Sequence, residues 1–318
     1  MLSRREWLSL TLATGAAAAF DRAWLSGQQP LIMRAVPGSN ERLPIVGLGS
    51  SATFSQVARG SDVTAVTDVL KALVSGGGTV FDTAPGYGAS EEVAGRVAAG
   101  LSYTDKIFWA TKVNVAGGFG GGGGSANPAA ARSQIDTSFA RLKKATIDLI
   151  QIHNLGDVPT HLAVLRELKQ QGRIRYLGVT TTFDQQYPQI VDIMKREPLD
   201  FIGVDYAIDA REVEDTILPV AQERKIGVLS YQPFGRTRLW NRVGNQPVPD
   251  YAREFDATTW AQFFIKFVAS HPAITVVTPA TSQAKNMTDN LGGGRGRLPD
   301  AAMRKRMIAT VDALPGGR

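Results

Sequence analysis

The chain has 318 residues, of which 43% are hydrophobic and 20% charged, and its formal net charge is +6. It contains no cysteine, which excludes disulfide bonds, thiolate metal ligands and cysteine nucleophiles and is compatible with an oxidising compartment. The basic residues are scattered and do not alternate with aromatic residues, so we expect no nucleic-acid partner. The mild positive excess favours an anionic ligand such as a phosphorylated cofactor.

Residues 1–30 have the pattern of an export signal and linker. Arg4 and Arg5 precede an apolar stretch, residues 8–20, that ends in small residues and is too short to span a bilayer. The arginine pair is typical of a twin-arginine signal. We therefore expect export, to the bacterial periplasm, with no stable membrane span after signal removal. The alternative is an amphipathic N-terminal helix with a chance arginine pair.

From residue 31 onward, short apolar segments alternate with turn residues and helical patterns. Residues 31–36 and 42–46 flank the turn-rich stretch 37–40 and predict a β-hairpin. Eight strand candidates follow, several of them apolar throughout, as expected of strands buried on both faces. They span residues 46–50, 79–83, 107–113, 148–154, 174–181, 201–206, 226–231 and 274–279.

Stretches with helical spacing of apolar residues lie between most of these strands. They span residues 63–74, 128–142, 160–170, 212–224 and 260–270. This alternation, without a composition break, predicts an α/β fold, namely one (β/α)8 TIM barrel over residues 31–318. A doubly wound sheet is the alternative, but Gly47-Leu48-Gly49 lacks the third glycine of a dinucleotide-binding fingerprint.

Four polar residues fall where the predicted strands end, and that is the rim on which such barrels carry their chemistry. Asp82 ends the second strand and Tyr87 follows it, while Lys112 and His153 end the third and fourth strands. An ammonium beside a phenol favours the phenolate, which should lower the pKa of Tyr87 from its usual value near 10. The carboxylate keeps the ammonium charged, and the imidazole can bond the same substrate oxygen.

This group suits protonation of a carbonyl oxygen while a hydride from a cofactor arrives at carbon. Each residue also has a purely structural interpretation. Asp82 would cap a helix beginning near Ser90, Lys112 would pair with any barrel acid, and His153 would be a satisfied strand-end histidine. The occurrence of all four on one rim favours catalysis. A metal-dependent isomerase or lyase is less favoured, because the rim offers few carboxylates and histidines and no metal site is predicted.

With these residues in view, the sequence resembles the aldo-keto reductase family from residue 33 to about residue 300. Residues 81–91 (FDTAPGYGASE) match the family segment that carries the catalytic Asp and Tyr. Residues 110–112 (ATK) match its lysine strand, and residues 136–153 match its helix and histidine strand. The resemblance implies Asp82, Tyr87, Lys112 and His153 as the catalytic group and NADP(H), with NAD(H) as the alternative, as the cofactor.

The resemblance implies that the hairpin of residues 31–46 closes the barrel floor. It also implies how the cofactor is held. Thr180 and Thr181 would bond the carboxamide and Tyr231 would stack on the nicotinamide. The remaining implied contacts are Gln232, Phe234, Arg236, Thr281, Ser282, Gln283, Asp289 and Asn290. The phosphate end of this assignment also has a physical basis, because a helix starting near Ser282 would present its N-terminus to an anion after the eighth strand.

Three departures from the family pattern limit what can be transferred. Gly203 stands where the family usually has a Gln against the carboxamide, and Ser51 stands where some members have a substrate-pocket Trp. Ala280, Gln283 and Asn286 stand where NADP-preferring members carry Lys or Arg, and only Lys285 is basic in that loop. The expected partner is a small carbonyl or alcohol compound, namely an aldehyde, ketone or sugar. The alternative function is a cofactor-binding accessory or sensor protein with little turnover.

Overall fold

A computed structural model of the chain describes residues 29–117 and 124–316. Eight parallel strands lie in chain order, each hydrogen-bonded to the next. They are β3 (Leu48–Gly49), β4 (Val80–Asp82), β5 (Phe108–Val113), β6 (Ile147–Ile152), β7 (Ile174–Thr181), β8 (Phe201–Asp205), β9 (Gly227–Tyr231) and β10 (Val276–Val277). The amide of Gly47 donates to Val277 at 2.9 Å and the amide of Val277 donates to Ile45 at 2.8 Å, so the last strand joins the first and the barrel is closed. The predicted (β/α)8 fold is confirmed.

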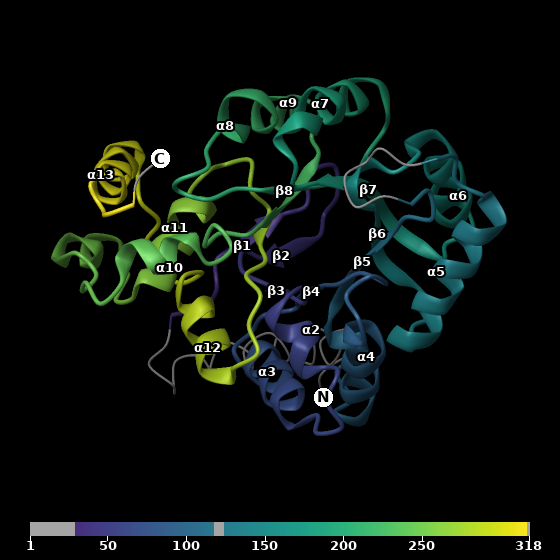
Figure 1. Ribbon diagram of the computed structural model, residues 1–318, viewed down its shortest axis with the longest axis horizontal. Coiled ribbons are helices and arrows are strands. Elements are labelled where there is room, and N and C mark those ends of the chain that lie inside the picture. The colour runs from purple at the N-terminus through teal and green to yellow at the C-terminus, as the bar shows by residue number, and fades with distance from the viewer. Residues whose placement is uncertain (1–28, 118–123, 317–318) are drawn as a thin grey trace, which may run out of the picture.

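Helices surround this barrel, as Figure 1 shows. They are α2 (Thr53–Val57), α3 (Thr64–Ser75), α4 (Ser90–Gly100), α5 (Pro128–Leu142), α6 (Val158–Gln170), α7 (Tyr187–Arg196), α8 (Val213–Thr216), α9 (Leu218–Glu223), α10 (Arg238–Val243), α11 (Trp260–Ala269), α12 (Ala284–Gly292) and α13 (Ala301–Asp312). Short 3-10 turns cover Thr104–Lys106, His153–Leu155, Asp184–Gln186 and Asp250–Phe255. No helix within residues 29–117 and 124–316 is both long and apolar enough to cross a membrane.

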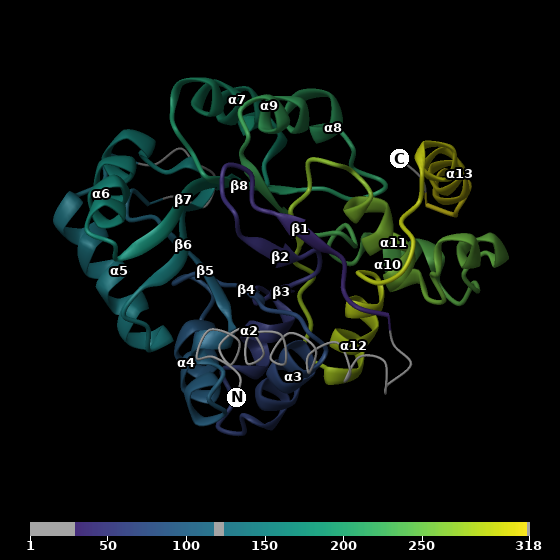
Figure 2. The same ribbon diagram turned by 180° about the vertical axis from the view of Figure 1, so that it is seen from behind.

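The predicted hairpin forms between β1 (Met33–Ala35) and β2 (Arg42–Pro44), which pair antiparallel. Seen from behind, it lies across one end of the barrel (Figure 2). Its Val36 and Leu43 are buried in one cluster with Val80 and Phe201, which begin or nearly begin their strands. The hairpin therefore closes the amino-terminal floor and leaves the carboxyl ends of the strands open for a site.

Strand alternation determines which side chains reach that site, because successive residues point to opposite faces of a sheet. Trp109 packs outward against Phe81, with ring centroids 5.2 Å apart, in the layer between barrel and helices. Phe108 and Ala110 lie in the inner cluster. Asp82 and Lys112 share that inward parity, so both point into the barrel near its open end.

Two of the differences from the predicted helices involve proline. Residues 212–224 were expected as one helix but form α8 and α9, since Pro219 lacks the amide proton needed to continue the first segment. Helix α7 was not predicted. Its Ile190, Ile193 and Met194 are buried at helical spacing, but Pro188 in its first turn obscures the start of the pattern.

Candidate active site

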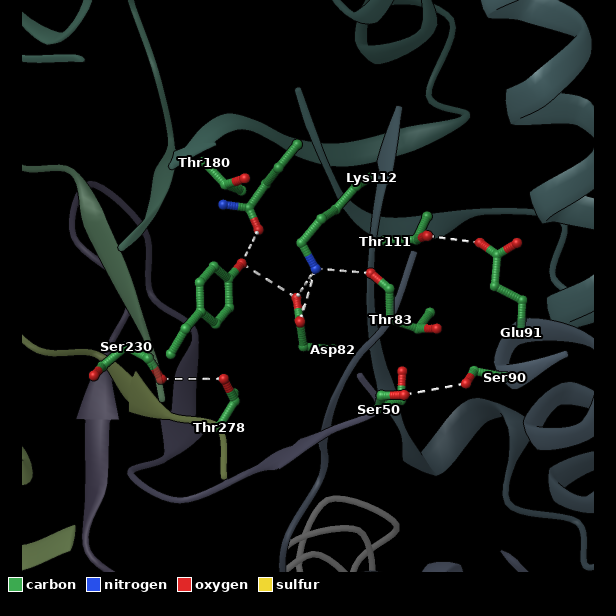
Figure 3. Close-up of polar contacts among 12 residues, drawn as sticks. Ser50, Asp82, Thr83, Ser90, Glu91, Thr111, Lys112, Thr180, Ser230 and Thr278 are labelled. Carbon is green, nitrogen blue, oxygen red and sulfur yellow. Dashed lines mark hydrogen bonds and ion pairs between the residues drawn. The ribbon is translucent and has the colours of Figure 1, made fainter. Parts of the chain in front are cut away.

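The centre of the site is a buried ion pair between the ends of β4 and β5. Lys112 Nζ lies 2.9 and 2.8 Å from the two carboxylate oxygens of Asp82 and 2.8 Å from the carbonyl oxygen of Thr83, as Figure 3 shows. Burial would lower the pKa of Lys112, but the charges of Asp82 and Tyr87 outweigh it, so that pKa lies above its usual value. Helix α4 has no side-chain cap, so the interpretation of Asp82 as its cap is wrong.

Tyr87 lies in the loop between β4 and α4, beside this pair. The ammonium of Lys112 is 5.1 Å from the centroid of its ring. Burial raises the pKa of Tyr87 above its usual value, while Lys112 acts in the opposite direction. The expected lowering is therefore wrong in sign for the cofactor-free protein, because desolvation of the phenolate outweighs the neighbouring ammonium. Tyr87 is firmly protonated at neutral pH and suits the role of a proton donor.

His153 directly follows β6 and faces Tyr87, with ring centroids 5.7 Å apart in an edge-to-face arrangement. Burial, assisted by the charge of Lys112, lowers the pKa of His153 to about 3. The imidazole is therefore neutral at physiological pH. Asn154 and Leu155 follow with positive φ values of 55° and 54°, which is rare for leucine and indicates local strain where the strand ends.

A cavity of about 310 Å³ opens beside these groups. Its lining consists of Pro85, Gly86, Tyr87, Lys112, Asn114, Gly117, Gln134, His153 and Asn154. Sequence reasoning missed the three amide side chains, although Asn154 was recognisable as a polar residue at the end of a buried strand. Asn114 donates to the carbonyl oxygen of His153 at 2.9 Å, and so helps to fix the backbone at the histidine.

Tyr231, at the end of β9, was expected to stack on a nicotinamide. Its hydroxyl reaches into the barrel, 3.0 Å from Gln151 Oε1 and 3.3 Å from Asp82 Oδ1. A Cβ atom at Gly203 would lie only 2.4 Å from the Tyr231 ring and hydroxyl. The glycine that departs from the family pattern is therefore the residue that leaves room for this ring. Stacking on a nicotinamide stays a prediction.

The two threonines expected at the carboxamide point in different directions. Thr180 has the inward parity of the barrel and its hydroxyl accepts from the amide of Asn154 at 3.3 Å. Thr181 points toward the surrounding helices, and its hydroxyl donates to Gln186 Oε1 at 2.5 Å. The two hydroxyls therefore lie on opposite faces of β7, because adjacent strand residues cannot share a face, and their contacts with the carboxamide stay predictions.

The loop after β9 brings Gln232, Phe234 and Arg236 to the rim. Gln232 and Arg236 have φ values of 54° and 61°, so this loop turns sharply. Arg236 is exposed, and its charge weakly favours the phenolate form of Tyr87. Phe234 packs on Trp240, with ring centroids 4.9 Å apart. Arg238, considered for the rim in the same way, is held by Asp209 at 2.6 and 3.0 Å.

The segment between β10 and α12 contains the remaining expected cofactor residues. Thr281 is buried and its hydroxyl accepts from the amide of Gln283 at 3.2 Å, while Ser282 is half-buried. Gln283 precedes the first residue of α12 and makes no side-chain cap.

Two residues at the other end of α12 differ in their partners. Asn290 is buried, and within the described residues its Nδ2 has no partner. Asp289 instead accepts from Thr259, at 3.0 and 2.9 Å, and from Gln262 at 2.7 Å. It faces α11, and its contact with the cofactor stays a prediction.

Comparison with known proteins agrees with this geometry. The model of the aldo/keto reductase family matches residues 45–307. The chain belongs to the aldo/keto reductase family. It is 30% identical over 203 residues to aldo-keto reductase YhdN of Bacillus subtilis, a match that covers 62% of this chain and 60% of that protein. It is 27% identical over 284 residues to probable aldo-keto reductase 1 of Glycine max, covering 79% and 81% of the two chains.

Solved structures of the family share the fold. Aldo-keto reductase AKR11C1 from Bacillus halodurans, in its holo form, gives a TM-score of 0.70 at 22% identity over 88% of this chain and 96% of its own. The Klebsiella pneumoniae aldo/keto reductase in complex with NADP and acetate gives 0.69 at 22% identity, covering 89% and 96%. The glycerol dehydrogenase AKR11B4 of Gluconobacter oxydans gives 0.68 at 22% identity, covering 88% and 95%. At these identities the likeness establishes the fold of this aldo/keto reductase.

Proposed function

We propose that this aldo/keto reductase transfers a hydride between NADP(H) and a small carbonyl or alcohol compound, with Tyr87 as the proton donor and acceptor. The observation that carries the proposal is the convergence of Tyr87, Lys112, Asp82 and His153 on one cavity at the open end of the barrel. Similar enzymes solved with NADP or NADPH, and a neighbour titled as a glycerol dehydrogenase, support the cofactor and the substrate class.

In reduction, the substrate's carbonyl oxygen lies between the hydroxyl of Tyr87 and the imidazole of His153. Neutral His153 orients that oxygen by a hydrogen bond, and Tyr87 gives it a proton as negative charge develops. Lys112 stabilises the phenolate that remains, and Asp82 keeps Lys112 charged and in place. When bound, the reduced nicotinamide supplies the hydride that no side chain can donate. Oxidation of an alcohol uses the same groups in reverse.

The chain's own residues fit such a cofactor. The amides in the first turn of α12 have no side-chain cap and lie where barrels bind phosphate. The buried Asn290 has an unused Nδ2 among the described residues, which would suit a purine ring beside it. Exposed Arg236 would pair with the pyrophosphate. We therefore expect Arg236, Asn290 and the start of α12 to hold the phosphate and adenosine parts.

The proposal is tested by binding first and turnover second. Affinities for NADPH and NADH are measured by fluorescence titration, and a panel of small aldehydes, ketones and sugars is then assayed. Tyr87→Phe should bind NADPH as the wild type does but lose on the order of a hundredfold in turnover. Tyr187→Phe, which removes a phenol bonded to Asp205, is the matched control. Unchanged turnover in Tyr87→Phe would refute the assignment, and binding without any turnover in the wild type would favour an accessory or sensor role.

We also propose that the protein is exported to the periplasm by the twin-arginine route. The proposal rests on Arg4-Arg5, the apolar residues 8–20 and the absence of cysteine. Residues 1–28 lie outside the part of the chain that the structure describes. Since this route carries folded proteins, the cofactor would travel inside the barrel, and we expect tight retention where no soluble NADPH pool exists.

Cell fractionation of the wild type and of the Arg4→Lys/Arg5→Lys variant tests the route, and the absorbance of the purified periplasmic protein tests retention. Wild-type protein found wholly in the cytoplasm would refute export. A cofactor-free, fully active periplasmic enzyme would contradict retention and favour a different electron partner.

A further inference from the structure

Tyr231 contacts the catalytic ion pair from inside the barrel. Its hydroxyl lies 3.3 Å from Asp82 Oδ1 and 3.0 Å from Gln151 Oε1. The ammonium of Lys112 is 5.1 Å from the centroid of the Tyr231 ring and 5.1 Å from that of Tyr87. The charge of Lys112 therefore lies against two aromatic faces while it bonds Asp82, an arrangement that favours the cation.

The position of this ring depends on Gly203, in the neighbouring strand β8. A Cβ atom built at Gly203 would lie 2.4 Å from Tyr231 Cε2 and Oη and 2.6 Å from Cζ. Atoms at such distances overlap, so any other residue at position 203 would push the ring away from Asp82. The absence of a side chain at Gly203 in β8 thus leaves the space that the phenol ring of Tyr231 in β9 occupies.

The hydroxyl of Tyr231 is a permanent donor in this environment. Complete burial, together with the charge of Asp82, raises the pKa of Tyr231 well above its usual value, so the phenol is not itself an acid at working pH. Its one proton has two possible acceptors, Asp82 on β4 and Gln151 on β6, the strands on either side of the β5 strand that carries Lys112. Gln151 in turn donates to the carbonyl oxygen of Val179 at 3.4 Å, which anchors it to β7.

We infer that Tyr231 is a positioning residue that fixes the carboxylate of Asp82, and through it the ammonium of Lys112, and that Gly203 is required to admit its ring. This inference rests on the proposed function only where turnover is the readout. The contacts themselves are those of the cofactor-free protein. A phenol that merely filled the barrel would need no acceptor on the catalytic acid, and its loss would change stability but not the titration of Asp82.

The first test measures the titration of Asp82 in the cofactor-free protein by carboxyl carbon NMR, with the signal assigned by its loss in Asp82→Asn. The groups facing Asp82 are Lys112, Tyr87 and Tyr231, and Arg236 and His153 lie beyond them. In Tyr231→Phe the carboxylate loses a donor, so it should titrate at higher pH than in the wild type. Gly203→Ala should move it in the same direction.

The double variant separates coupling from two independent effects. If Gly203 acts through the hydroxyl of Tyr231, adding Gly203→Ala to Tyr231→Phe should cause little further change in the titration of Asp82. Tyr206→Phe is the matched control, because Tyr206 is also a buried phenol and its hydroxyl bonds Glu214 and Arg304, away from Asp82. It should leave the titration of Asp82 unchanged.

The second test measures carbonyl reduction as a function of pH. Tyr231→Phe should lower kcat about tenfold, the factor that matches loss of one hydrogen bond to a buried charged group, with little change in KM. The acidic limb of the kcat profile of Tyr231→Phe should move to higher pH. In this variant Asp82 becomes protonated at a higher pH than in the wild type, and the protonated form no longer holds Lys112.

The outcomes distinguish the positioning role of Tyr231 from the proposed redox reaction. Identical titration of Asp82 in the wild type and Tyr231→Phe would overturn the positioning role, whatever the activity. A shifted titration in a wild type that reduces no carbonyl would sustain the positioning role and refute the proposed reaction. If Gly203→Ala does not fold, the comparison of the Asp82 titration in Tyr231→Phe and Tyr206→Phe still tests the positioning role of Tyr231.

Discussion

Lys112 Nζ lies 2.8 Å from Asp82 Oδ2, with the two side chains only 1% and 5% exposed. Removing one partner of such a buried pair is costly, because the charge of the other partner is left without a counter-charge and without water to solvate it. We predict that Lys112→Met lowers the free energy of unfolding by about 3–5 kcal/mol and that Lys112→Met/Asp82→Asn recovers much of the loss. Urea denaturation measures both.

Lys144→Met provides the contrast for this prediction. Lys144 bonds Asp105 at 2.8 Å, but that carboxylate is 93% exposed, so water replaces the lost partner. Unfolding of this variant should match the wild type closely. A small loss in Lys112→Met, comparable to that in Lys144→Met, would show that water reaches Asp82 in the folded protein.

The protonation of Tyr87 leads to a prediction about alkaline pH. Because burial raises the pKa of Tyr87 above its usual value, the phenol keeps its proton through about pH 10. Carbonyl reduction, which uses the protonated form, should show no basic limb below that pH. Alcohol oxidation, which uses the phenolate, should rise with pH across the same range. A basic limb in kcat/KM for reduction near neutral pH would contradict a burial-dominated Tyr87.

The catalytic group was predictable because the four residues follow strands whose carboxyl ends must meet in a closed barrel. The locations of all eight strands were predictable from the apolar segments between turn residues, and the hairpin floor from the family resemblance. The direction of the Tyr87 pKa shift was not predictable, since desolvation depends on how deeply the loop packs. The contact of Tyr231 with Asp82 was not predictable either. The resemblance assigned Tyr231 the usual role of this position in the family, but it did not show that Gly203 leaves room for the ring inside the barrel.

The cofactor residues show the limits of position alone. Thr181 and Asp289 stand at positions where the family resemblance places cofactor contacts, yet their hydrogen bonds go to Gln186 and to α11. Strand alternation already places the side chains of Thr180 and Thr181 on opposite faces, so the direction of Thr181 was predictable from sequence. The partner of Asp289 was not, because it depends on how α12 packs beside α11.

The buried Asn290 gives a prediction about binding. Within the described residues its Nδ2 has no partner, so Asn290→Ala should change the unfolding of the cofactor-free protein little while weakening NADPH about tenfold or more, the effect of losing one hydrogen bond. Asn40→Ala, in the exposed turn of the hairpin at the opposite end of the barrel, is the control and should bind as the wild type does. Fluorescence titration with NADPH distinguishes them. Equal affinities in the two variants would remove Asn290 from the cofactor site.

The floor of the barrel gives a prediction about stability without a change in chemistry. Leu43 of the hairpin is 3% exposed and packs among the inward residues at the start of the strands. Leu43→Ala should lower the free energy of unfolding by about 2–5 kcal/mol, the usual cost of emptying a core leucine. Below its melting transition it should keep the kcat of the wild type, because the floor lies at the opposite end from Tyr87. A lowered kcat at full folding would show that the hairpin also positions the rim.

His153 gives a prediction about acid stability, with its sign set by the lowered pKa. In the folded protein the pKa of His153 is about 3, whereas in the unfolded chain it is the ordinary 6.5. As pH falls from about 6.5 towards 3, His153 becomes protonated in the unfolded chain but stays neutral in the folded protein. The folded protein is therefore destabilised relative to the unfolded chain over that pH range. At pH 5 the loss from this residue is about 2 kcal/mol. His153→Gln should therefore lose less stability than the wild type between pH 7 and pH 5, as measured by urea denaturation at both values. An equal loss in the two proteins would mean that the imidazole is hydrated or paired with an acid when folded.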